Sequence, residues 1–269
     1  MPSASALLAL VRWENALISA AGVAVGAWWA RGDPAALRVL AAAVAAVMLT
    51  AHANAYNDVC DREIDVIAHP RRPLPSGRMS VRAALAVAAV AAVLGVALSA
   101  AARPALGTMS LGVVALMVAY NRGIKRMGLP GNLLVALLAS FPFLYGAWAV
   151  GRPRAALALL ALAVPLHLAR EIAKDLEDAH ADTGRRQTLP IALGPRGARW
   201  SLVAALALFV AALARFAIHR PLFAVVVTPA LALTALGAYR ALRGEHGSPV
   251  LFKTAMVCAM ASLVAAPRG

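Results

Sequence analysis

Two groups of aspartates with the same spacing are the residues of this sequence best suited to do chemistry. Each group places its carboxylates at positions i, i+3 and i+7, which share one face of a helix at about 100° per residue. The groups are Asp58, Asp61 and Asp65, and Asp175, Asp178 and Asp182. They contain half of the 12 acidic residues in the chain. Like charges this close are unfavourable unless a cation lies between them, so the spacing predicts two catalytic triads that hold Mg²⁺.

Basic residues follow each triad along the chain. Two adjacent arginines and a Leu-Pro step come shortly after the last aspartate. They are Arg71, Arg72, Leu74 and Pro75 in the first case, and Arg185, Arg186, Leu189 and Pro190 in the second. Arginine presents a planar fork of donors that suits phosphate oxygens. The duplicated combination of acids and arginines therefore indicates a site for a metal-bound polyanion.

Further polar residues lie in or near the apolar segments on the triad side, where each is costly unless it is used. We predict that the following residues bind substrate: Asn15, Asn54, Asn57, Arg72, Tyr120, Lys125, Asn132, Arg170 and Lys174. Simpler roles remain open for some of them. Asn15 and Asn132 could pack or cap helices, Tyr120 could be an interfacial aromatic residue, and Lys125 could be a topological anchor.

A mouth lined by acids and cations above a long apolar interior suits a lipid with a diphosphate head. Mg²⁺ prefers hard oxygen ligands and commonly keeps substrate phosphates in its coordination shell. The reaction that this arrangement favours is loss of pyrophosphate from an allylic carbon, which an acceptor then attacks. The metal would stabilise the charge that develops on the leaving group. The expected partners are therefore a prenyl diphosphate donor and a lipid or aromatic acceptor.

The elements that must position these residues are transmembrane helices. The chain of 269 residues is 62% hydrophobic and 14% charged, whereas soluble domains are about half apolar and about a quarter charged. This composition excludes an ordinary soluble protein and predicts an all-α polytopic membrane protein. The net charge of +14 is then explained by cytoplasmic loops rather than by nucleic acid binding. With only two cysteines, Cys60 and Cys258, neither a disulfide framework nor a zinc site is expected.

Apolar windows long enough to cross a bilayer predict nine transmembrane helices. They are expected at residues 12–30, 36–60, 81–101, 104–121, 130–150, 155–178, 197–217, 221–241 and 249–266. The triads follow the second and sixth helices, so both lie on one side of the membrane. Because Lys and Arg are concentrated in the loops on that side, we expect an active site that faces the cytoplasm. The interval of four helices between the triads also predicts two four-helix repeats plus a ninth helix around a central cavity, all in a single domain over residues 1–269.

The two acidic segments resemble the paired signatures of the UbiA superfamily of intramembrane prenyltransferases. The signatures have the forms NDxxDxxxD and DxxDxxxD, which stand here at residues 57–65 and 175–182. Further segments resemble the archaeal-type branch of this superfamily, which makes digeranylgeranylglyceryl phosphate. These segments are RPLPSG at 72–77, YNRGIKRMGLPGN at 120–132, REIAKDLED at 170–178 and TLP at 188–190.

The resemblance implies nine transmembrane helices, Mg²⁺ dependence, and transfer of a geranylgeranyl group from its diphosphate to the sn-2 hydroxyl of geranylgeranylglyceryl phosphate. It favours Arg72 over Arg71 as the functional arginine. The acceptor phosphate would need cations of its own, for which Arg122, Lys125 and Arg126 are available.

Other functions remain open from the sequence. Within the superfamily, the alternative is prenyl transfer to an aromatic acceptor in quinone or pigment biosynthesis. A cation transporter and a non-catalytic lipid-binding scaffold are alternatives from other classes. The acids cluster at one membrane face rather than at the midplane, which argues against a transporter. Nothing in the sequence indicates an oligomeric state.

Overall fold

Helices make up all the regular structure in the described part of the chain, as the composition predicts. This part of the computed structural model comprises residues 3–31, 36–182, 187–218 and 220–265, except for the side chains of residues 180–182. The chain forms two compact units, Met1–Ile124 with Pro142–Arg154, and Lys125–Phe141 with Ala155–Gly269. The first triad lies in the first unit and the second triad in the second unit.

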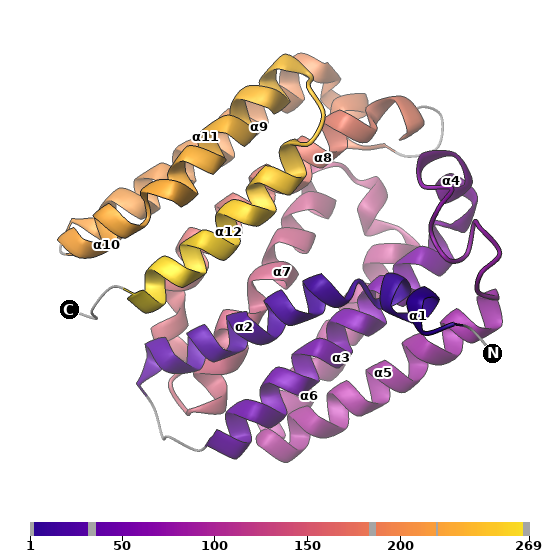
Figure 1. Cartoon of the computed structure of the whole chain (residues 1–269), viewed down its shortest axis with the longest axis horizontal. Helices are drawn as coiled ribbons and strands as arrows, with labels where there is room; N and C mark the ends of the chain where they lie inside the picture. The colour runs from indigo at the N-terminus through magenta and orange to yellow at the C-terminus, as the bar shows by residue number, and fades with distance from the viewer. Residues whose placement is uncertain (1–2, 32–35, 183–186, 219, 266–269) are drawn as a thin grey trace. The chain divides into compact units, whose positions relative to one another are not determined.

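The first unit is built around helix α3. Its helices are α1 (Ala4–Val11), α2 (Trp13–Ala30), α3 (Ala36–Cys60), α4 (Arg62–Ala68), α5 (Val81–Ala102), α6 (Pro104–Arg122) and the second half of α7 (Leu129–Ala149). Helix α3 packs against α5 and also contacts α1, α2 and α6, and Figure 1 shows α2, α3 and α5 running side by side. Small residues such as Ala42, Ala45 and Ala55 line the buried face of α3, so the helix backbones approach closely.

Glycines allow α2 to pack tightly against the second half of α7. A Cβ atom added to Gly146 would overlap the carbonyl oxygen of Val23, and one added to Gly26 would overlap the carbonyl oxygen of Phe143. Gly22, one turn before Gly26, lies against the ring of Pro142 in the same way. Small residues four apart are the usual means of bringing membrane helices into backbone contact. The pair Gly22 and Gly26 therefore explains why α2 lies directly on α7.

The second unit is built around helix α8. Its helices are the first half of α7, α8 (Leu157–Asp182), α9 (Leu189–Ala217), α10 (Pro221–Val226), α11 (Thr228–Arg243) and α12 (Ser248–Ala265). Helix α8 packs against α9 and α12, and α11 packs against α12. Short 3₁₀ helices, η1 (Ile124–Arg126) and η2 (Pro153–Ala156), precede α7 and α8. The chain bends inside α9 at Gly194, whose φ of 71° is not helical.

The number of membrane-spanning helices differs from the nine that the sequence predicts. In the described ranges, seven helices are long and apolar enough to cross a membrane, and the pair α1 and α2, bent by 52°, makes an eighth candidate. The segment predicted at 221–241 is divided between α10 and α11 at Val227. Pro229 occupies the first turn of α11 and has no N–H with which to continue α10. Neither piece alone is long enough to count as a span.

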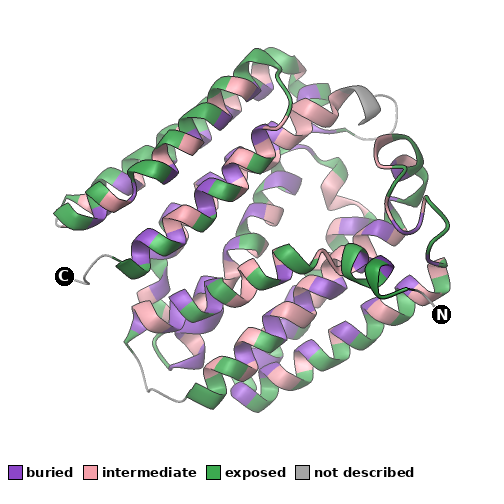
Figure 2. Ribbon diagram, viewed as in Figure 1, coloured by how far each residue is buried: buried purple, intermediate pink, exposed green. Residues whose placement is uncertain are grey.

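Apolar side chains are exposed in the middle of the long helices. On α5, for example, Val90, Val93 and Leu94 are all exposed. Figure 2 shows such exposed positions recurring along α5, α9 and α11. Exposed apolar surface of this extent on helices of spanning length is the surface that faces lipid. The fold is therefore that of a polytopic membrane protein.

Candidate active site

The aspartates of the first triad lie where α3 gives way to α4. Asp58 is in the last turn of α3, Asp65 is in α4, and Asp61 lies between the two helices with φ −94° and ψ 3°. The sequence predicts an uninterrupted helix face here, whereas the structure has a short break at Asp61. The bond from the Asp61 N–H to the Asn57 carbonyl, 2.9 Å long, carries the helical register across the break. All three carboxylates are buried.

Two arginines occupy the space beside these carboxylates. Arg72 Nη1 lies 2.6 Å from Asp65 Oδ2 and 3.6 Å from Asp58 Oδ1, so a single guanidinium bridges the first and last aspartates of the triad. Arg12 Nη2 lies 2.5 Å from the same Asp58 Oδ1. The sequence predicts that a cation must separate these like charges. In this structure that cation is a guanidinium group.

Arg12 is a site residue that the sequence motifs do not predict. Its φ of 49° and ψ of 62° place it in the left-handed region, between α1 and α2. This conformation is uncommon for a residue with a side chain and costs on the order of 1 kcal/mol, so it persists only where neighbouring contacts hold it. The signal in the sequence was a single arginine within an apolar segment. The backbone conformation that aims it at the triad could not be read from the sequence.

Asn54 supplies the contacts that hold Arg12. Its Oδ1 accepts a hydrogen bond from Arg12 Nη1 at 3.1 Å, and its Nδ2 donates to the carbonyl of Val11 at 2.9 Å. The amide therefore grips both the guanidinium and the backbone at the bend. The sequence predicts substrate binding for Asn54, and the structure places it one helical turn before Asp58, bonded to Arg12.

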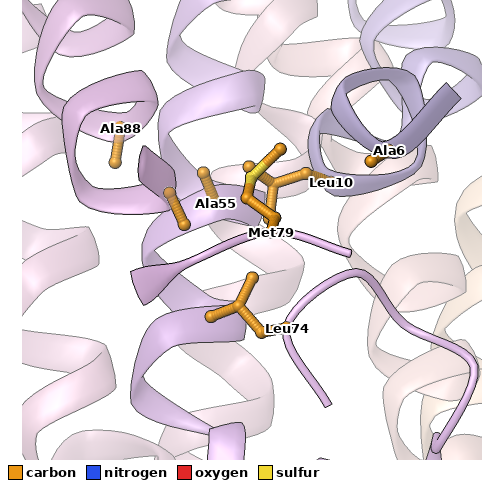
Figure 3. Packing of buried hydrophobic residues seen from close by; sticks show 7 residues of the cluster. Ala6, Leu10, Ala55, Leu74, Met79 and Ala88 are labelled. Atoms are coloured by element: carbon orange, nitrogen blue, oxygen red, sulfur yellow. The ribbon is translucent and has the colours of Figure 1, made fainter. Parts of the chain in front are cut away.

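The loop that follows α4 positions Arg72. Leu74 and Met79 insert into an apolar cluster on the first unit (Figure 3). The other buried members of this cluster are Ala6, Leu10, Ala55, Ala84 and Ala88. Gly77 has a φ of 72°, which lets the loop turn back between the two anchoring side chains. The RPLPSG segment therefore acts as an anchored strap that delivers Arg72 to the acids.

A cavity of about 440 Å³ opens beside this charge cluster. Its lining consists of Ala9, Arg12, Asp58, Ala68, His69, Pro70, Arg71, Arg72 and Pro73. Three arginines and one buried aspartate thus meet at the same hollow. Such a wall suits an anionic ligand that brings or shares a cation.

The second triad is held differently, within the second unit. Asp175 Oδ2 accepts a hydrogen bond from Asn132 Nδ2 at 2.8 Å and one from the Leu189 N–H at 3.4 Å. Three segments distant in sequence, the start of α7, α8 and the start of α9, therefore meet at this carboxylate. The structure brings predicted residues Asn132 and Asp175 together, and the Leu-Pro step that follows the second triad contributes a backbone donor.

The other residues predicted around the second triad have varied positions. Asp178 and Lys174 are half-buried on α8. Arg170 forms an ion pair with the adjacent Glu171. Glu177, which lies between the two described aspartates, accepts hydrogen bonds from Ser248 N at 2.8 Å and Ser248 Oγ at 2.6 Å and so caps α12. The side chain of Asp182, and Arg185 and Arg186, lie outside the described residues.

Four other predicted substrate-binding residues lie at or near the ends of helices. Asn15 is in the first turn of α2, Asn57 is in the last turn of α3, Tyr120 is near the end of α6, and Lys125 is in η1. All four are half-buried. Their positions at helix ends agree with a location near the membrane surface, and a direct role in binding stays a prediction.

Comparison with known proteins places these signatures in a family. The model of the UbiA prenyltransferase family matches residues 17–261, which include both acidic segments. The chain belongs to the UbiA prenyltransferase family. It is therefore a prenyltransferase and an integral membrane protein, as the resemblance and the composition predict.

One relative in the UbiA family matches nearly the whole chain. It is the digeranylgeranylglyceryl phosphate synthase of Natronomonas pharaonis, which is 37% identical over 96% of this chain and 95% of its own length. Solved UbiA structures share the fold. The apo structure of a UbiA homolog from Aeropyrum pernix K1 has a TM-score of 0.82, is 23% identical, and covers 94% of this chain and 98% of its own.

A second solved structure carries ligands. It is a UbiA homolog from Archaeoglobus fulgidus bound to GPP and Mg²⁺, with a TM-score of 0.72 and 20% identity over 97% of this chain and 98% of its own. These likenesses establish the UbiA fold for the chain. They agree with the all-α membrane architecture that the sequence predicts.

The donor atoms of the first site fit the Mg²⁺ that its sequence signature implies. Carboxylate oxygens are hard ligands, and Mg²⁺ is commonly held by one or two carboxylates together with water and substrate phosphates. Among the described residues, no group of three acidic, histidine or cysteine side chains is arranged so that it could hold a metal ion by itself. The suitable donor chemistry and the lack of a complete metal site agree if Asp58 and Asp65 supply part of the Mg²⁺ coordination shell and a diphosphate supplies the rest.

Proposed function

We propose that this prenyltransferase moves a geranylgeranyl group from its diphosphate to the sn-2 hydroxyl of geranylgeranylglyceryl phosphate, in ether lipid synthesis. The observation that carries the proposal is the 37% identity, over nearly the full length of both chains, to a digeranylgeranylglyceryl phosphate synthase. The donor class is further supported by the related UbiA protein that binds GPP and Mg²⁺. The cavity lined by Arg12, Arg71 and Arg72 is consistent with an anionic head group.

The residues of the first unit would bind and orient the donor head. Asp58, Asp61 and Asp65 are proposed as ligands that would hold Mg²⁺ together with the diphosphate. Arg12 and Arg72 would donate to the phosphate oxygens as planar forks. When bound, Mg²⁺ supplies positive charge that stabilises the departing pyrophosphate. Asn54 keeps Arg12 aimed at the site through its two hydrogen bonds.

The second unit would supply further metal and substrate ligands. Asp175 and Asp178, with Asp182, are proposed as metal ligands, and Asn132 as the residue that orients Asp175 through the 2.8 Å hydrogen bond. Lys125, Arg170, Lys174, Asn15, Asn57 and Tyr120 are proposed as further contacts to substrate. We propose that both units work as a single domain, with an active site that faces the cytoplasm.

The transfer itself balances without an external oxidant or reductant. The bond between the allylic carbon of the donor and its phosphate oxygen breaks, and pyrophosphate leaves with the electron pair. The sn-2 hydroxyl oxygen forms the new ether bond to that carbon, and its proton is lost to pyrophosphate or to water. The chain's own contribution is to hold the diphosphate and the acceptor hydroxyl in line.

The test is pyrophosphate release by the purified protein with Mg²⁺ and geranylgeranyl diphosphate, with and without geranylgeranylglyceryl phosphate. We expect release that depends on the acceptor, and a product whose mass carries both prenyl chains. If an aromatic acceptor such as a hydroxybenzoate supported release and the glyceryl phosphate did not, the ether lipid assignment would be wrong.

A further inference from the structure

The same carboxylate oxygens that would bind metal are held by arginines in the first unit. Asp58 Oδ1 lies 2.5 Å from Arg12 Nη2 and 3.6 Å from Arg72 Nη1, and Asp65 Oδ2 lies 2.6 Å from Arg72 Nη1. A divalent ion and these guanidinium groups cannot both bind closely to the same carboxylate oxygens at the same time. Binding of metal at this triad therefore requires that one or both arginines give up their contacts.

We propose that Arg12 and Arg72 compete with the divalent metal for the first triad until a diphosphate draws them away, so that metal and diphosphate bind cooperatively. This inference rests on the proposed function, because it assigns the diphosphate as the anion that receives the two guanidiniums. It adds a specific role for Arg12, which no sequence motif singled out, and a thermodynamic link between the two ligands.

The burial of the groups places the arginines between the acids and the cavity. The side chains of Asp58 and Asp65 are 2% and 4% exposed, whereas those of Arg12 and Arg72 are 30% and 24% exposed. All but Asp65 line the 440 Å³ cavity. A ligand that enters the cavity therefore meets the guanidiniums before it meets the carboxylates.

The cost of separating buried charges makes the exchange cooperative. Metal alone would displace guanidiniums and leave them without an anion. Diphosphate alone would draw the guanidiniums away and leave the carboxylates unpaired beside its own negative charge. Breaking a buried ion pair by removing one partner is strongly unfavourable. When both ligands bind, each charged group has a new partner, and each ligand must raise the affinity for the other by the same factor.

The exchange needs movement of side chains only. The backbone at Arg12 is fixed by the Asn54 hydrogen bond to the Val11 carbonyl, and its own carbonyl accepts the N–H groups of Asn15 and Ala16. The strap that carries Arg72 is anchored by Leu74 and Met79 in the apolar cluster. Both guanidiniums sit on long side chains from fixed positions, and so can turn from the acids toward the cavity.

The experiment uses two separate titrations of the full-length protein in nanodiscs. Mn²⁺, a paramagnetic substitute for Mg²⁺, is titrated alone and its free concentration is read by electron paramagnetic resonance. Labelled pyrophosphate is then titrated at fixed Mn²⁺. In Arg72→Gln and in Arg12→Gln we expect Mn²⁺ alone to bind about tenfold more tightly than in wild type, and pyrophosphate with Mn²⁺ to bind about tenfold more weakly, within the usual range of coupling between sites.

Arg62→Gln is the matched control. Arg62 lies in the same acidic segment and its loss changes the charge equally. Its side chain is 52% exposed, and its ion pair is with Glu63, which is 90% exposed, at 4.0 Å. We expect both affinities of this variant to stay near wild type. If Arg62→Gln tightened Mn²⁺ binding as much as the other variants, the effect would be net charge and the exchange would be refuted.

The opposite signs of the two shifts separate exchange from damage to the fold, which would weaken both ligands together. Mn²⁺ binding that is unchanged or weaker in both glutamine variants overturns the proposal. Arg12→Lys and Arg72→Lys, which keep the charge but lack the fork, provide a second pair in which the same opposite shifts should be smaller. No prenyl group or acceptor is present, so these titrations remain decisive even if the transferase assay fails.

Discussion

At the scale of single residues, Asp58 is the point where the charges of the first unit meet. It contacts both Arg12 and Arg72, and it is the aspartate of this triad that lines the cavity. We therefore expect Asp58→Asn, which removes the charge and keeps the shape, to lower kcat/KM for prenyl transfer by at least about 100-fold, the scale seen when one group that stabilises developing charge is lost. The measurement is Mg²⁺-dependent pyrophosphate release at saturating acceptor.

Glu63→Gln is the control for this change. Glu63 is two residues from Asp61 in the same acidic segment, yet its side chain is 90% exposed. We expect its activity to remain within a few-fold of wild type. Equal losses in the two variants would mean that the total negative charge of the segment matters rather than the triad, and full activity in Asp58→Asn would remove the triad from the mechanism.

How far the sequence predicted this site depends on the kind of residue. Asp58 and Asp65 could be placed together because helical periodicity puts positions i and i+7 on one face, and the break at Asp61 is too small to undo this. Arg72 could be predicted from its place in the motif. Arg12 could not, because its role depends on a left-handed backbone conformation that arises only where α1, α2 and α3 meet.

At the scale of helices, the same limit applies to polar residues whose partners are remote. Glu177 stands between Asp175 and Asp178 and was indistinguishable by composition from a site residue. Its carboxylate instead caps α12 through Ser248, a contact across 71 positions of sequence. The division at Val227, in contrast, has a local signal, because Pro229 lies inside the predicted span at 221–241 and has no N–H with which to continue the preceding helix. Long-range packing decided the role of Glu177, whereas the break at Val227 has a local cause in the chain.

Packing of α2 on α7 gives a prediction at this scale. A methyl group at position 146 would overlap the carbonyl oxygen of Val23, which belongs to the backbone and cannot turn aside. We expect Gly146→Ala to lower the free energy of unfolding by about 1–3 kcal/mol, the usual cost of overpacking a tight interface. Thermal unfolding in detergent micelles, followed by circular dichroism, measures the change.

Gly112→Ala is the matched control for that substitution. Gly112 lies within α6, and a Cβ atom added there has no neighbouring atom within 4 Å. Because alanine favours a helix over glycine, this variant should equal or exceed wild type, by no more than about 1 kcal/mol. A Gly146→Ala protein as stable as Gly112→Ala would show that α2 and the second half of α7 are not in backbone contact.

At the scale of the whole molecule, the two compact units follow the duplication that the acid triads indicate. Each unit contains one triad, which spans the end of α3 and the start of α4 in the first unit and lies on α8 in the second. Each triad is joined to a segment that precedes it and to one that follows it in the chain. In the first unit these are the residues around Arg12 and the strap with Arg72. In the second they are Asn132 and the Leu189 N–H. Among the described residues, the guanidiniums of Arg12 and Arg72 hold the first triad, whereas the Asn132 amide and the Leu189 N–H hold Asp175 of the second.

The orientation of the chain in the membrane supplies the last prediction. Helix α5 (Val81–Ala102) has 22 residues, and at about 1.5 Å per residue it just exceeds the roughly 30 Å hydrocarbon core of a bilayer. Its first end adjoins the strap that carries Arg72, and beyond its last end Arg103 Nε donates to the Ala149 carbonyl at 2.8 Å. Glu63 and Arg152, both exposed, therefore report on opposite faces. In a background with Cys60→Ser and Cys258→Ser, we expect a membrane-impermeant maleimide to label Glu63→Cys only from the cytoplasmic face and Arg152→Cys only from the other. The reverse pattern would place the first triad outside the cytoplasm, and labelling of both from one face would mean that α5 does not cross the membrane.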